Sequence, residues 1–146
     1  MEIEYFTKLE RIPHKEVTIF MVTILRELPT PLQWQFTVES FREEFERVKN
    51  EHNKFAFIMD VRGIGRLSIA QIKEFVNLLE TYNYVLQDYL IATSIYTTNN
   101  SILAVLFEIL KTFYKTKKPL KFVYTLESAY EHIDSFEKGI IRDVTN

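Results

Sequence analysis

Residues 55–71 read FAFIMDVRGIGRLSIAQ, and this stretch decides the fold. Its first five residues are apolar without interruption, which is typical of a strand buried on both faces. The run ends in Asp60, and the loop that follows holds two of the three glycines in the chain. Ser68 and Gln71 have the spacing of a capping box, which predicts that a helix begins there. In an open α/β sheet such a turn lies at the edge where ligands and partners bind.

The composition is that of one folded domain spanning residues 1–146. The chain is 47% hydrophobic and 26% charged, with a net charge of −2 at pH 7. This charge argues against a general nucleic-acid binder, which usually carries a basic excess. The absence of cysteine excludes disulfides and thiolate metal sites. No leader peptide is visible, and no apolar run reaches the roughly 20 residues of a membrane helix, so a cytoplasmic protein without a transmembrane segment is expected.

Four other segments have the patterns of strands. Residues 3–9 alternate loosely between apolar and polar, and residues 17–25 are rich in β-branched side chains. A turn is predicted over residues 12–15, because Pro13 cannot donate to a ladder, so the two segments should form an antiparallel hairpin. The remaining strands are predicted at residues 89–96 and 120–124.

Helices are predicted between these strands. Val38, Phe41, Phe45 and Val48 recur at the spacing of one helical face within residues 36–51. The cap of this helix is Thr30, followed by Pro31 at the first helical position, or else Thr37. The second helix runs from Ser68 to about residue 82 or 86, with Ile69, Ile72, Phe75, Val76 and Leu79 inward. The others are predicted at residues 102–115 and 126–136.

The order of these elements predicts an α/β fold with a single mixed sheet. About five strands are expected, with the N-terminal antiparallel hairpin followed by βαβαβα parallel units and four main helices. Strand and helix alternate from residue 55 onward, and such alternation requires parallel strands joined by right-handed crossovers.

Two local stretches carry a resemblance to a known fold. Residues 57–64, FIMDVRGI, resemble the apolar strand, Asp and Gly of STAS domains. Residues 84–91 together with 107–116 are similar to the helix-strand-helix passage of CRAL-TRIO lipid-binding domains. With the element order, they resemble the SpoIIAA-like fold that these two families share.

The resemblance implies two kinds of binding. STAS anti-sigma-antagonist proteins carry Asp-Ser at the start of the second helix, where a partner kinase phosphorylates the Ser. Counting from Asp60, those two positions fall on Ser68 and Ile69, so Ser68 becomes a candidate phosphosite only if the loop is one residue shorter. Similarity to CRAL-TRIO domains implies an apolar ligand, although this chain lacks their extra N-terminal helices and long gate segment.

The parallel sheet should bring several polar turns to one edge. Asp60 either holds a cation or orients a partner, or it accepts backbone N–H bonds from the following turn. The two glycines of the loop are expected to permit positive φ. We predict a partner- or ligand-binding rim made of Asp60, Arg62, Gly63, Gly65, Arg66, Ser68, Thr97, Thr98, Asn99 and Asn100.

The residues favour binding over catalysis. The histidines at 14, 52 and 132 are predicted on a hairpin turn, a helix end and the last helix, so they are not spaced as ligands of one metal or as bases for a nucleophile. We therefore expect no catalytic residues, no metal and no cofactor.

The leading hypothesis is a STAS-like regulatory or scaffold module that acts by binding another protein. The alternative is a small CRAL-TRIO-like protein that binds a lipid or another apolar ligand. A third hypothesis follows from the unusually apolar helix at residues 102–115, which either packs within the fold or forms a homodimer interface through Leu103 and Phe107.

Overall fold

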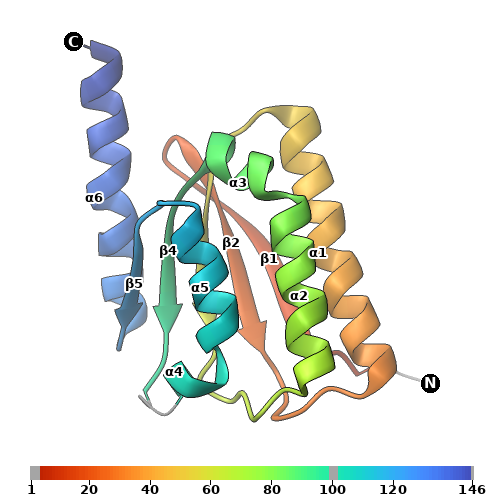
Figure 1. The fold of residues 1–146 in the computed structure, drawn as a ribbon. Coiled ribbons are helices and arrows are strands. Elements are labelled where there is room, and N and C mark those ends of the chain that lie inside the picture. The colour runs from red at the N-terminus through yellow and green to blue at the C-terminus, as the bar shows by residue number, and fades with distance from the viewer. Residues whose placement is uncertain (1–3, 99–101, 146) are drawn as a thin grey trace.

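The computed structural model contains one five-stranded sheet (Figure 1). It describes residues 4–98 and 102–145, without the side chains of residues 103, 105, 114 and 137–145. The strands lie in the order β1-β2-β3-β4-β5, and only β1 and β2 are antiparallel. Their bounds are β1 Thr7–His14, β2 Val17–Ile24, β3 Phe55–Asp60, β4 Leu90–Tyr96 and β5 Leu120–Val123. The mixed α/β sheet predicted from the sequence is confirmed.

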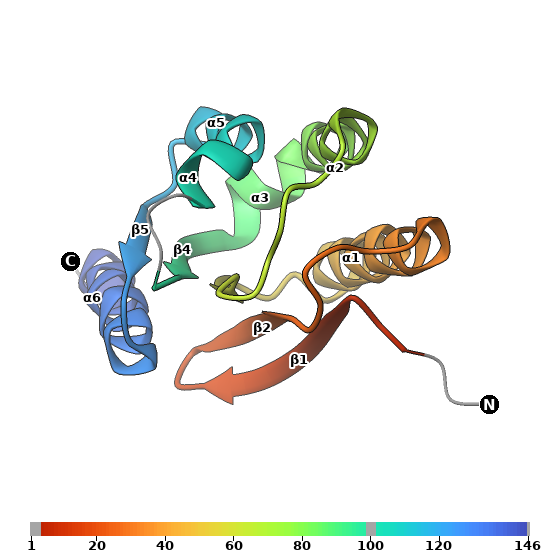
Figure 2. The same ribbon diagram turned by 90° about the horizontal axis from the view of Figure 1, so that it is seen from below.

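The described helices cover the two faces of the sheet unequally. Figure 2 shows α1 to α5 on one face, here called the front, and α6 by itself on the back. The bounds are α1 Pro31–Glu51, α2 Ile69–Thr81, α3 Asn83–Tyr89, α4 Ile102–Val105, α5 Phe107–Lys115 and α6 Leu126–Thr145.

Alternation along the strands separates two cores. On β3, Phe55, Phe57 and Met59 point to the front, where they join the phenylalanine-rich core beneath α1, α2 and α5. Ala56 and Ile58 point to the back and pack with residues of α6. All five are buried, as expected for a central parallel strand.

The start of α1 is fixed by Thr30. Its hydroxyl accepts a hydrogen bond from the backbone N–H of Gln33 at 3.2 Å, and the Gln33 side chain accepts one from the Thr30 N–H at 2.9 Å. This capping box, with Pro31 at the first helical position, decides between the two predicted caps. Thr37 is buried within the helix instead.

The first strand was predicted too early in the chain. β1 spans Thr7–His14 rather than residues 3–9, so the predicted turn at residues 12–15 is wrong except for its last residue. Pro13 lies inside the strand at a position whose backbone nitrogen faces away from β2, so its missing N–H breaks no bond of the hairpin. The chain turns at Lys15, which has φ 55°.

Two predicted helices are each divided. The second breaks at Tyr82. The centre of its ring lies 5.3 Å from that of Phe45, and its hydroxyl donates a hydrogen bond to the Glu46 carboxylate at 2.7 Å. The chain then continues as α3, which ends at Tyr89. The third divides at Leu106 into α4 and α5, and the last helix continues beyond residue 136 to Thr145.

Candidate partner-binding site

The carboxyl ends of the parallel strands β3, β4 and β5 lie side by side at the lower edge of the sheet in Figure 1. Asp60 lies beside Tyr96 on the next strand, and Tyr96 lies beside Val123. Hydrogen bonds continue past the strands, from the Val61 N–H to the Tyr96 carbonyl at 3.0 Å and from the Thr97 N–H to the Val123 carbonyl at 3.1 Å. The segments predicted to form the rim are therefore neighbours in space.

The Asp60 carboxylate is held by the turn that follows it. Oδ1 accepts hydrogen bonds from the Arg62 backbone N–H at 3.3 Å and from Nε at 2.9 Å, and Oδ2 accepts one from Nη2 at 2.9 Å. These bonds raise the pKa of the Arg62 guanidinium, which also lies 4.3 Å from the centre of the Tyr96 ring. Of the two roles considered for Asp60, the geometry favours organising the turn over holding a cation.

The loop from residue 61 to 67 is anchored at both ends by apolar side chains. Val61 and Leu67 are buried, and the Ile64 N–H donates to the Val61 carbonyl at 3.1 Å. Between these anchors the Gly65 N–H donates to the Glu27 carbonyl at 2.6 Å, which ties this loop to the one that precedes α1. The rim residues from Arg62 to Arg66 therefore lie on a loop held at both ends and at its middle.

The glycines of this loop have a different purpose from the one predicted, because neither has positive φ. A Cβ on Gly65 would lie 2.5 Å from Cγ and 3.0 Å from the carbonyl oxygen of Glu27, so only glycine allows the two loops to approach this closely. A Cβ on Gly63 would meet its nearest atom, the Ile24 oxygen, at an ordinary 3.9 Å.

Ser68 is the N-cap of α2, as its spacing from Gln71 predicts. Its Oγ accepts a hydrogen bond from the Gln71 N–H at 3.1 Å, and the Gln71 side chain accepts one from the Ser68 N–H at 3.0 Å. Ile69 follows as the first helical residue, so the position after the cap has no hydroxyl. Modification of Ser68 stays a prediction.

The remaining rim residues differ in exposure. Arg66 and Thr98 are exposed, whereas Thr97 is buried. Asn99 and Asn100 lie outside the described residues.

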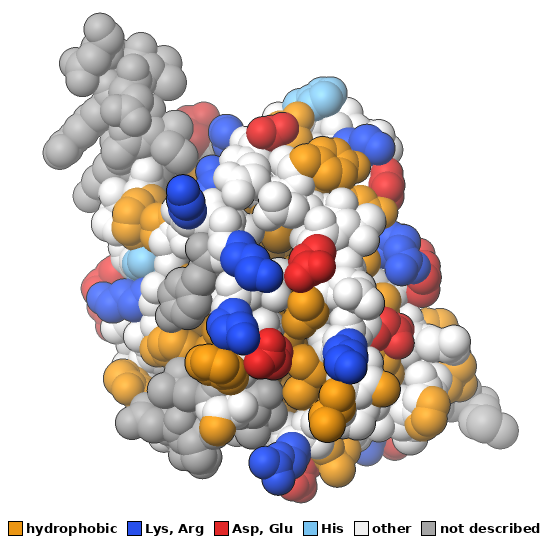
Figure 3. Space-filling model, viewed as in Figure 1, with side chains coloured by type: hydrophobic (Ala, Val, Ile, Leu, Met, Phe, Trp, Pro, Cys, Tyr) orange, Lys and Arg blue, Asp and Glu red, His pale blue; other side chains and the backbone are white. Residues whose placement is uncertain are grey.

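An apolar patch adjoins the rim, and the sequence did not predict it. Ile69 is 75% exposed, although its spacing had placed it inward. One cleft, of about 330 Å³, lies on one side of α2 and is lined by Ile69, Ile72 and Val76 together with polar residues. A second cleft, of about 390 Å³, lies on the other side and is lined by Leu32 and Phe36, again with polar residues. Figure 3 shows hydrophobic side chains gathered over α2 and the start of α1. We call Leu32, Phe36, Ile69, Ile72 and Val76 the apolar patch.

The apolar side of α2 extends from the core to the surface. Phe75, Leu78 and Leu79 are buried in the core, and Ile72 and Val76 are half-buried against it, as predicted, while Ile69 is exposed. An apolar side broader than the buried residues alone is the signal that could have revealed the patch.

The apolar helix predicted at residues 102–115, which is α4 and α5 in the structure, packs mostly within the fold. Its described buried apolar side chains, Ile102, Leu106, Ile109, Leu110 and Phe113, belong to the front core. Phe107 is 56% exposed, and the side chain of Leu103 lies outside the described residues. Homodimerisation through these two residues stays a prediction.

A small apolar cavity lies between the sheet and the helices α1, α2 and α5. Its volume is about 60 Å³, and its lining includes Trp34, Val61, Leu67, Leu106 and Phe113. Drug-sized ligands occupy pockets of about 300–1,000 Å³, whereas a water molecule takes about 30 Å³. The cavity is therefore too small, as it stands, for a lipid.

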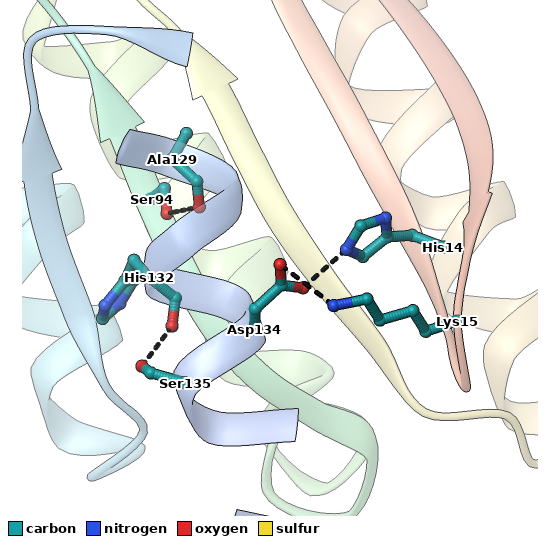
Figure 4. Close-up of polar contacts among 7 residues, drawn as sticks. All are labelled: His14, Lys15, Ser94, Ala129, His132, Asp134 and Ser135. Carbon is teal, nitrogen blue, oxygen red and sulfur yellow. Dashed lines mark hydrogen bonds and ion pairs between the residues drawn. The ribbon is translucent and has the colours of Figure 1, made fainter. Parts of the chain in front are cut away.

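The helix α6 is tied to the back of the sheet by polar contacts (Figure 4). Asp134 accepts from His14 Nε2 at 2.6 Å and from Lys15 Nζ at 3.2 Å, and the Ser94 hydroxyl donates to the Ala129 carbonyl at 3.0 Å. The His132 ring points away from both contacts. These groups attach α6 and do not converge on a common point.

The described residues lack the features of two other kinds of site. No group of three or more histidine, aspartate or glutamate side chains there could hold a metal ion. None of the helices in that part of the chain is long and apolar enough to span a bilayer.

The comparisons with known proteins identify the fold. No protein-family model matches the sequence, and no curated protein matches it significantly. An uncharacterised protein of the DUF3478 family from Shewanella loihica PV-4, described as having a SpoIIAA-like fold, aligns with a TM-score of 0.65. The alignment covers 91% of this chain and 98% of that one, at 7% identity. The chain has a SpoIIAA-like fold.

A second structure with some similarity to this SpoIIAA-like fold is an anti-sigma factor antagonist from Mycobacterium paratuberculosis. It aligns with a TM-score of 0.47 and 15% identity, covering 88% of this chain and 94% of that one.

Proposed function

We propose that this chain is a non-catalytic module, regulatory or scaffold in role, that acts by binding another protein. The binding surface is the rim around Asp60 to Ser68 together with the apolar patch beside it.

The observation that carries this proposal is the exposure of the apolar patch. Ile69 on α2 is 75% exposed, and Leu32 and Phe36 on α1 are 61% and 40% exposed. Isolated apolar residues on a surface need no explanation, but a group that lines clefts on both sides of one helix is typical of an interaction site. A partner's apolar side chains would fill these clefts.

The polar rim supplies the other half of such a site. Arg66 is exposed and has no ion pair among the described residues, so it is available to a partner's carboxylate. Asp60 and Ser68 are already engaged in the turn and in the helix cap. They hold the loop in shape, which lowers the entropy cost of binding, and this arrangement suits recognition better than chemistry.

A photo-crosslinking experiment tests the proposal. A benzophenone side chain placed at Ile69 should yield one discrete adduct in cells that express the chain, because this position would lie inside the interface. The same group at Tyr84, which is 48% exposed on α3 at the other end of the molecule, is the matched control.

The two positions must differ for the proposal to stand. The adduct from Ile69 should be absent at Tyr84 and should weaken when Arg66→Glu is added. If Ile69 gives no adduct, or if both positions give the same adduct in similar yield, the surface proposed here is not the binding site.

A further inference from the structure

One edge of the sheet is open. β1 is the outermost strand, with β2 on one side and no strand among the described residues on the other. Figure 2 shows α6 on the back of the sheet toward β5, and it meets β1 at His14, the last residue of that strand. An open edge presents unpaired N–H and C=O groups, which are a template for pairing with another strand.

The backbone groups available at this edge follow from the hairpin. The Leu25 N–H donates to the Phe6 carbonyl at 2.8 Å, and these residues are opposite one another in the register of the pair. In an antiparallel ladder the direction of the backbone groups alternates, so even-numbered residues of β1 face β2. The outward-facing residues are therefore Thr7, Leu9, Arg11 and Pro13.

We propose that this edge binds a second copy of the chain, with the two β1 strands antiparallel about a two-fold axis at Leu9. Leu9 then pairs with Leu9, and Thr7 pairs with Arg11 of the second copy. Every outward N–H and C=O of these three residues finds a partner, because odd-numbered residues oppose odd-numbered residues. The sheets of the two copies become continuous.

The charges of β1 select this register. Lys8 lies opposite Glu10 of the second copy, and the two-fold axis repeats the contact. Within one chain these side chains form an exposed pair at 2.7 Å and are 58% and 43% exposed, so both can turn to a new partner. Charged residues on an edge strand usually oppose pairing, but here the two signs are complementary in the two-fold arrangement.

The neighbouring two-fold registers are unfavourable. Moving the axis by one residue places Lys8 opposite Lys8 or Glu10 opposite Glu10, and like charges directly opposite each other destabilise a ladder. Pro13 limits the ladder at its far end, because its nitrogen faces outward and carries no hydrogen. The inference does not rest on the proposed partner site, whose residues lie on α2, on the loop before it and on the first turns of α1.

A charge exchange tests the pairing by sedimentation equilibrium across a dilution series. The unmodified chain should dimerise, and Lys8→Glu should raise the dissociation constant by about tenfold or more, because two attractions become two repulsions. Adding Glu10→Lys to that variant should restore the original dissociation constant. Phe107→Glu, which probes the exposed side of α5 instead, should leave the dimer unchanged.

Cysteine pairing gives a second readout in a chain that has no cysteine of its own. Residues 8 and 10 of opposite copies form a non-hydrogen-bonded pair with Cα atoms about 4.5 Å apart, within the range of a disulfide. Mixed Lys8→Cys and Glu10→Cys proteins should therefore cross-link, and either protein alone should not.

Several results would overturn the inference. A monomer at every concentration would do so, as would a dimer that Lys8→Glu leaves intact or a dimer lost only in Phe107→Glu. So would failure of the charge-exchanged variant to recover the original dissociation constant, if the cysteine mixture also fails to cross-link.

Discussion

The contact between Gly65 and Glu27 makes the position of the loop from residue 61 to 67, here called the rim loop, testable. In Gly65→Ala the new Cβ would lie 2.5 Å from the Glu27 Cγ and 3.0 Å from its carbonyl oxygen. The side-chain atom can move, but the carbonyl belongs to the backbone and accepts the Gly65 N–H at 2.6 Å. The two loops must therefore separate, and the hydrogen bond between them must weaken.

The expected cost follows from these two effects. Overpacking costs about 1–3 kcal/mol, and a typical hydrogen bond contributes about 1 kcal/mol. We expect Gly65→Ala to lower the free energy of unfolding by about 2 kcal/mol, which corresponds to a decrease in Tm of roughly 4–8 °C for a chain of this size. Gly63→Ala should be neutral or stabilise the fold by up to about 1 kcal/mol, because its backbone is unstrained and its Cβ has room.

Urea denaturation followed by circular dichroism measures both variants against the unmodified chain. A third protein, Gly65→Ala with Glu27→Ala, lacks the Cγ atom but keeps the carbonyl, so it should recover only part of the loss. Equal stability of Gly65→Ala and Gly63→Ala would show that the two loops do not approach as closely as described.

Three other predictions concern the cap, the last helix and the cavity. Ser68→Ala should cost about 1 kcal/mol in urea denaturation, while Ser68→Asp, which can still cap α2, should stay close to the unmodified chain; equal losses in the two would contradict the cap. Burial, with a smaller effect of Lys121, lowers the pKa of His132, so the unfolded chain binds this proton more tightly and stability should fall as the pH drops below about 6.5. His132→Gln should flatten this dependence, and an unchanged slope would refute the assignment. Native mass spectrometry of the freshly purified protein should give the mass of the chain without lipid, because the volume of the cavity is only about 60 Å³. A co-purifying lipid would contradict this and support the alternative hypothesis of a lipid-binding protein.

Local signals in the sequence predicted much of the fold. The apolar run of residues 55–59 gave the central strand, and the spacing of Ser68 and Gln71 gave the start of α2. Both signals are complete within a few residues. The resemblance to a SpoIIAA-like fold is confirmed by the structural similarity.

The features that sequence reasoning missed depend on distant residues. Gly65 is required by Glu27, which belongs to a different loop, and the helix break at Tyr82 is accompanied by contacts to Phe45 and Glu46 on α1. Neither partner can be identified from the local pattern. Ile69 was misplaced for a related reason, since helical spacing puts it on the same side as Ile72 and Val76 but does not say where that side leaves the core.

The location of the binding surface is tested most directly by amide NMR. The protein captured by cross-linking at Ile69 would be titrated into the ¹⁵N-labelled chain. We predict that shifts concentrate at residues 61–76, in the rim loop and the first two turns of α2, and that amides of α3 and β5 stay unchanged. Shifts confined to α6 or to α3, with the amides of residues 61–76 unmoved, would contradict the proposed site.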